Sequence, residues 1–206
     1  LVLLAGWLLS QLRPESLLFG NGDLRFLFGA LPVNLYDPST FIRIEAIVTA
    51  ANLTAVALLL SLLVADNGPR RLLFLLLLAA ACLVRMLAFM VLFEGRHALA
   101  WLTPGATAGL LIGVPVALAA MSLRRGTAIG VCGVLLMAAT ALVNLAPANP
   151  YLVVAHQAWY QGHFLNFNGL TRVVSTLWPF AALAFLSMYG ARALNAASRP
   201  ERGGRL

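Results

Sequence analysis

The sequence predicts an all-α protein, a polytopic transmembrane helical bundle of about six spans with short interfacial helices on its outer side. The 206 residues are 61% hydrophobic and only 10% charged, whereas soluble domains are about 45–50% apolar and about 25% charged. Five stretches are apolar over the roughly 20 residues that a helix needs to cross the hydrocarbon. The arginines between these stretches are also distributed unevenly, as they are in membrane proteins.

The spans follow from the apolar runs in chain order. Residues 1–12 form a short apolar run, which we interpret as the remaining end of a first, truncated span and hence the chain as a fragment. The full spans are predicted at residues 44–65, 72–93, 104–123, 127–146 and 171–190. Six crossings put both ends on one side. Residues 1–206 are therefore expected to form a single transmembrane domain, in which residues 191–206 are a flexible cytoplasmic tail.

Arginine alone sets the predicted orientation, because the chain contains no lysine. One side carries, in short segments near span ends, Arg70, Arg71, Arg124, Arg125, Arg192, Arg199, Arg202 and Arg205. Cytoplasmic loops collect arginine, and the bias is strongest in short loops. We therefore expect a multi-pass protein of the bacterial inner membrane with a cytoplasmic C-terminus. Because the charges do not form a patch on a folded domain, the expected partner is membrane lipid and no nucleic acid.

The two long outer segments are predicted to lie at the membrane interface. Residues 24–31 are apolar but too short to span. Apolar and polar side chains of residues 151–162 fall on opposite faces at helical spacing, which predicts a short amphipathic helix that ends at Gly162. A turn is predicted at residues 166–169, before the last span. The outer-face candidate site comprises the polar and aromatic residues His156, Trp159, His163, Asn166 and Asn168. The histidine spacing matches no helical zinc site, so we predict no metal and no cofactor, and no catalytic residue is assigned.

Arg85 is the most informative single residue. It lies roughly 12 Å inside the third span, where a charged side chain costs at least about 2.5 kcal/mol and should face the bundle interior. In the preceding span Glu45, Thr49 and Asn52 follow one helical stripe. We predict that Arg85 bonds Asn52 and approaches Glu45 in a buried polar cluster. Two interpretations stay open: a structural staple that fixes helix register, and a site for an anion or lipid headgroup.

Small residues and prolines predict how the spans pack. Gly105, Gly109 and Gly113 form a flat face, which we expect to meet the glycines that begin the next span. Pro179 falls inside the last span and leaves the carbonyl of Ser175, four residues earlier, without its helical donor. We expect Ser175 to help satisfy this carbonyl.

Four motifs resemble those in the C-terminal membrane half of long proteobacterial VanZ-like proteins. They are residues 7–14 (WLLSQLRP), 101–105 (WLTPG), 161–170 (QGHFLNFNGL) and 177–180 (LWPF). The resemblance implies a role in the cell envelope and in tolerance of glycopeptide antibiotics. The acidic, histidine, arginine and asparagine residues of the family core are not found in this chain, so no functional residue is carried over.

Three classes of function follow from these features. The first is an envelope protein that interacts with lipid or lipid-linked cell-wall precursors from the outer leaflet. The second is an intramembrane transferase or hydrolase that acts on a lipid-linked substrate, with His156 or His163 as base and Arg85 on a phosphate. The third is a small transporter, a class that kinked helices and a buried charge favour.

Overall fold

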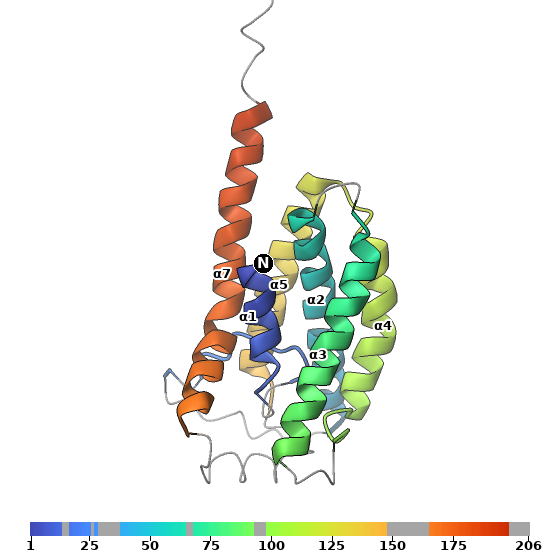
Figure 1. Ribbon diagram of the computed structural model, residues 1–206, viewed down its shortest axis with the longest axis vertical. Helices are drawn as coiled ribbons and strands as arrows, with labels where there is room; N and C mark the ends of the chain where they lie inside the picture. Colours follow the sequence, from blue (N-terminus) through green and yellow to red (C-terminus); the bar gives the residue numbers. More distant parts are fainter. Residues whose placement is uncertain are drawn as a thin grey trace, which may run out of the picture.

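The computed structural model is a bundle of helices, shown in Figure 1. It describes residues 1–13, 17–25, 27–28, 38–64, 68–92, 98–147 and 165–197, without the side chains of residues 92, 165–168 and 193–197. The helices of these residues are α1 (Val2–Ser10), α2 (Pro38–Leu63), α3 (Arg70–Leu92), α4 (Pro104–Ala120), α5 (Arg125–Leu145) and α7 (Leu165–Ala197). No strand occurs in this part of the chain, and the prediction of an all-α fold is confirmed there.

Helix α2 is the centre of the bundle. It packs along α4 and α5, and its residues 52–62 are all buried. The run from Leu53 to Leu60 contains a single polar side chain, Thr54, and a helix that is apolar all round is typical of the centre of a bundle or of a membrane span. The neighbours of α2 cover it along residues 52–62.

Glycines bring α4 against the backbone of α2. A Cβ atom added at Gly105 would lie 2.8 Å from the carbonyl oxygen of Ile42, and one at Gly113 would lie 2.8 Å from the Cα of Ala50. The predicted flat glycine face is thus present, but its predicted partner is wrong. The face meets α2, while Gly126 and Gly130 of α5 have nothing within 4 Å of an added Cβ.

Helices α1 and α7 form a second pair, seen in blue and orange in Figure 1. The Nε1 of Trp178 donates to the carbonyl oxygen of Leu3 over 2.7 Å. Helix α7 begins at Leu165, so residues 166–169 are helical and the predicted turn there is wrong. Helix propensity is a weak prior that tertiary context overrides, so a long helix can include asparagine and glycine.

Within the part of the chain that the structure describes, four helices are long and apolar enough to cross a membrane: α2, α5, residues 70–91 of α3 and residues 169–192 of α7. Helix α4 is apolar but has 17 residues. Figure 1 shows that the α2–α3 and α4–α5 turns lie at one end of the bundle, where α7 also ends. The arginines of those turns, Arg70, Arg71, Arg124 and Arg125, therefore share one end, which we call the arginine end. The chain has the construction of a membrane protein.

We expect Gly109→Ala to lower the free energy of unfolding by about 1–3 kcal/mol, the usual cost of overpacking. The new Cβ would lie 2.5 Å from the Cβ of Thr49 and 2.8 Å from the carbonyl oxygen of Ala46. Gly130→Ala is the matched control, because it has open space and improves helix propensity by about 1 kcal/mol. Unfolding by SDS in mixed micelles measures both variants. Equal stability of the two would contradict the close contact of α2 with α4.

Candidate functional site

A non-helical stretch of chain runs into the bundle at the end opposite the arginine end. Residues 17–25 lack helical structure, and residues 17–22 are all buried; we call residues 17–25 the buried segment. Phe19 packs its ring on Trp7 with centroids 5.2 Å apart. Irregular backbone at membrane depth is tolerated only where protein covers it or where it lines a wet cavity. Its backbone polar groups must therefore find partners on the surrounding helices.

Gly22 lets the buried segment pass between α5 and α7. Its φ of +85° lies in the region that glycine adopts without strain. A Cβ atom there would lie 2.8 Å from Thr140 Cγ2 and 2.9 Å from Pro179 Cγ. Both the conformation and the close approach require glycine at this position.

Helix α7 binds the buried segment through three hydrogen bonds. Pro179 has no N–H and leaves the carbonyl of Ser175 without its helical donor, and the amide of Gly22 donates to that carbonyl over 2.9 Å. The Ser175 hydroxyl donates to Asn21 Oδ1 over 3.0 Å. The Thr176 hydroxyl donates to the Asp23 carbonyl over 3.2 Å. The freed carbonyl at Ser175 was predicted, but its donor comes from a segment about 150 residues away in sequence.

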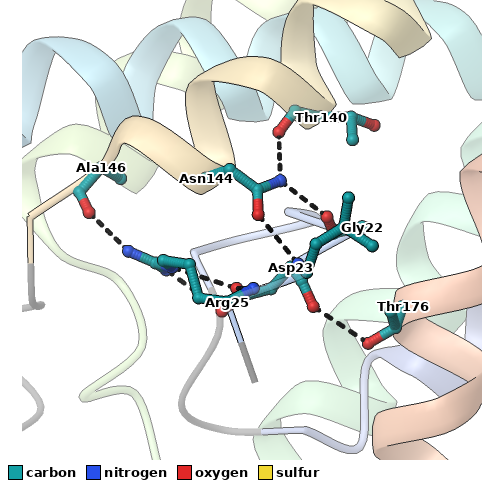
Figure 2. Close-up of polar contacts among 8 residues, drawn as sticks. Gly22, Asp23, Arg25, Thr140, Asn144, Ala146 and Thr176 are labelled. Atoms are coloured by element: carbon teal, nitrogen blue, oxygen red, sulfur yellow. Dashed lines mark hydrogen bonds and ion pairs between the residues drawn. The ribbon is translucent and has the colours of Figure 1, made fainter. Parts of the chain in front are cut away.

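Helix α5 binds the other edge of the buried segment, as Figure 2 shows. The Oδ1 of Asn144 accepts the amide of Leu24 over 2.8 Å. Its Nδ2 donates to the carbonyl of Gly22 over 2.8 Å and to that of Thr140 over 2.8 Å. The side-chain amide of Asn144 therefore bonds the backbone groups of the residues on both sides of Asp23, much as a neighbouring backbone would.

Asp23 and Arg25 form an ion pair at the rim of the buried segment. The two side chains meet at 3.0 Å and are about one fifth exposed, and Arg25 Nη1 also donates to the Ala146 carbonyl over 2.6 Å. Burial by itself raises the pKa of Asp23. The hydrogen bond and charge of Arg25, with the charge of Arg13, outweigh burial and bring that pKa below its ordinary value of 3.8. The carboxylate is thus held in its charged form.

Arg85 is buried in the bundle, with 1% of its surface exposed, as predicted. Its Nη1 donates to the backbone carbonyl of Arg13 over 2.5 Å. Its guanidinium carbon also lies 5.8 Å from the centroid of the Phe89 ring, a cation–π distance. The stripe of α3 that faces inward is formed by Phe74, Ala81, Arg85 and Phe89. Arg85 thereby connects α3 to the chain that leads into the buried segment.

Glu45 interacts electrostatically with Arg85 and lies at the start of α4. The hydroxyl of Thr103 donates to Glu45 Oε2 and accepts the amide of Ala106 over 3.1 Å as the N-cap of α4. A Cβ at Gly105 would lie 2.6 Å from the same carboxylate oxygen. A negative charge at a helix N-terminus is favourable, and glycine gives it room.

The other two residues of the predicted cluster lie elsewhere on the stripe of α2. The Thr49 hydroxyl donates to the Leu18 carbonyl over 3.1 Å and ties α2 to the buried segment. The Nδ2 of Asn52 donates to the Val48 carbonyl of its own helix over 3.1 Å. Arg85 thus bonds the Arg13 carbonyl and Asn52 bonds its own helix, and a bond between Arg85 and Asn52 stays a prediction. Glu45, Thr49 and Asn52 are all buried, as Arg85 is.

The outer-face candidate lies mostly outside the described residues. This holds for His156, Trp159 and His163, and for the predicted interfacial helix at residues 151–162. Asn166 and Asn168 belong to the first turns of α7, and their side chains are not described. Of residues 24–31, Leu27 and Phe28 are exposed, at 59% and 79%, and the interfacial position stays a prediction.

Sequence reasoning missed the residues that hold the buried segment: Asn21, Gly22, Asp23, Asn144 and Thr176. A signal was present in the run Gly20-Asn21-Gly22-Asp23, a strong turn pattern within an otherwise apolar region. In addition, the buried Nδ2 of Asn21 makes no hydrogen bond within the described part of the chain. The arrangement places Arg13, Arg25 and Arg85 with the two carboxylates Asp23 and Glu45, so arginines exceed carboxylates by one among these residues, which suits binding of an anionic or hydroxyl-bearing group.

We expect Asn144→Leu to release the buried segment from α5. The change removes the acceptor of the Leu24 amide and the donor to the Gly22 carbonyl, and each unpaired buried group costs about 1–3 kcal/mol. Amide hydrogen exchange in residues 17–25 should rise. Ser187→Ala is the control, because that exposed hydroxyl bonds only within α7. Unchanged protection of Leu24 in Asn144→Leu would show that Asn144 does not hold the segment.

We expect acid to weaken the fold partly through Asp23. A carboxyl whose pKa is lower in the folded protein adds stability above its unfolded pKa, here 3.8, and this contribution is lost as the pH falls through the folded pKa. Asp23→Asn should therefore be less stable than the parent near neutral pH and lose less stability on acidification to below about pH 4. Unfolding titrations in an uncharged detergent measure this difference. Parallel pH profiles would contradict it.

No protein-family model, curated protein or solved structure matches this chain significantly. The likeness of its short motifs to VanZ-like proteins stays a prediction. Function is therefore argued from the buried segment and the charged residues around it.

Proposed function

We propose that this chain is a six-span protein of the bacterial inner membrane, related to VanZ-like proteins, that binds a lipid or lipid-linked cell-wall precursor from the outer leaflet. Through this binding it contributes to envelope integrity and to tolerance of glycopeptide antibiotics. The C-terminus is cytoplasmic in this proposal.

One observation carries the proposal: three arginines gather around non-helical backbone at one end of an apolar bundle. Arg13 and Arg85 are almost fully buried, at 4% and 1% exposure, and Arg25 lies at the rim. Non-helical backbone and ionisable side chains inside a membrane are expensive, and both typically mark sites of ligand binding or transport. Guanidinium groups match phosphate in charge and geometry, which favours a phosphate-bearing headgroup.

The orientation supports an outer-leaflet ligand. The buried segment lies opposite the arginine end in Figure 1, and arginine-rich short turns favour the cytoplasmic side. The buried segment then faces the compartment in which cell-wall precursors are used. Neutral donors such as Asn21 Nδ2 would serve hydroxyl or amide groups of the same headgroup.

Binding of a polyprenyl phosphate to the purified protein tests the proposal. We expect Arg85→Lys, which keeps the charge but loses the planar donor set, to bind more weakly, by roughly tenfold if one charge-assisted hydrogen bond of about 1.5 kcal/mol is lost. Arg124→Gln at the arginine end is the control and should bind as the parent does. Size-exclusion chromatography verifies that each variant is folded. A folded Arg85→Lys protein with parental affinity would contradict a role of Arg85 in binding.

The cellular role is tested separately. A deletion strain should become more sensitive to glycopeptides and to detergent, and the parent sequence and Arg124→Gln should restore tolerance where Arg85→Lys does so poorly. If the deletion strain keeps full tolerance, the envelope role is wrong.

A further inference from the structure

A hollow of about 390 Å³ opens at the arginine end, far from the buried segment. It lies between the start of α3 and the residue that follows the C-terminal end of α4. Its lining residues are Gly68, Pro69, Arg70, Arg71, Leu72 and Met121. Two arginines thus line the hollow beside three apolar side chains, those of Pro69, Leu72 and Met121.

The two arginines of the hollow differ in their surroundings. Arg70 Nη2 donates to the carbonyl of Val64 over 3.0 Å, which holds the side chain at the C-terminal end of α2. Arg71 is exposed. One cation is therefore fixed by the fold, and its neighbour is accessible from outside the protein.

The charge of this end favours an anion. The sequence of residues 64–71 and 121–125 contains four arginines and one carboxylate, Asp66. Arg124 and Arg125 are exposed and follow Met121 by three and four residues. A basic turn at a membrane surface attracts anionic headgroups, at about 1 kcal/mol for each arginine near the surface.

An exposed apolar strip continues from the hollow along α3. Leu72, Leu76, Leu83 and Leu87 are each more than half exposed. Their spacing places them on one face of the helix, over roughly 22 Å at 1.5 Å per residue. Leu72 belongs to both the hollow and the strip. The cationic hollow and the apolar strip thus meet at Leu72. This arrangement matches a phospholipid, in which a charged headgroup is joined to apolar acyl chains.

We propose that this hollow binds the phosphate headgroup of an anionic glycerophospholipid in the leaflet at the arginine end, with its acyl chains along the leucine strip of α3. The phosphate lies against Arg70 and Arg71, and the glycerol lies against Leu72 and Met121. The site is separate from the outer-leaflet site proposed above and does not depend on it.

Lipid titration of the purified full chain in detergent tests the site. Phosphatidylglycerol and phosphatidylcholine with identical acyl chains are compared by native mass spectrometry. We expect tighter binding of phosphatidylglycerol, and an affinity about fivefold lower in Arg71→Gln. Arg192→Gln is the matched control, because it removes one exposed arginine of α7 at the same end; it should change the affinity less than about twofold. Met121→Trp fills the hollow at constant charge and should also weaken binding.

Three results would each overturn the site. Equal losses in Arg71→Gln and Arg192→Gln would indicate diffuse attraction in place of a defined site. Equal affinity for the two lipids, which both carry the phosphate, would show that the site does not select an anionic headgroup. Full competition by soluble glycerol phosphate at matched concentration would indicate a free-phosphate site that does not use the leucine strip.

Discussion

The hydrogen bond from the Gly22 amide to the Ser175 carbonyl is the contact on which the rest of the polar architecture depends. Pro179 creates the acceptor by removing a donor from α7, and Gly22 can reach it only because it has no Cβ. A proline within a membrane helix needs such a donor, because lipid offers none. The buried segment therefore supplies the hydrogen-bond donor that α7 lacks. Helix α7 in turn supplies partners for polar groups of the segment, which lowers the free-energy cost of burying them.

The backbone at and before the buried segment also provides hydrogen-bond acceptors for side chains of α2 and α3. The carbonyl of Arg13, just before the segment, accepts from Arg85, and that of Leu18, within it, accepts from Thr49. Glu45 balances part of the positive charge and also serves the start of α4 through Thr103. Helices α3 and α2 thus bond the backbone carbonyls of Arg13 and Leu18, while α5 and α7 bond the backbone of residues 22–24. Loss of any single partner leaves a buried polar group unsatisfied, which is costly at low dielectric.

The predicted polar cluster shows how far pattern reasoning reaches. The position of Arg85 deep in a predicted span indicated that its side chain is buried in protein. Exposing a guanidinium to lipid costs free energy whichever group would otherwise pair with it. Its partner was predicted from the stripe of α2, yet Arg85 bonds a backbone carbonyl and Asn52 bonds its own helix. Backbone carbonyls are present at every residue, so a list of polar side chains does not reveal which carbonyl a fold leaves open.

The sequence alone determined that the chain is helical, that it belongs in a membrane, which end collects arginine and that Arg85 is buried; it did not reveal the burial of Arg13. These properties follow from composition, period and depth, which are local or additive quantities. Only the tertiary structure decided that the glycine face of α4 meets α2, that residues 166–169 are helical and that residues 17–25 enter the bundle. Such choices depend on which helices become neighbours, and in lipid that is set by close packing and by hydrogen bonds between distant residues.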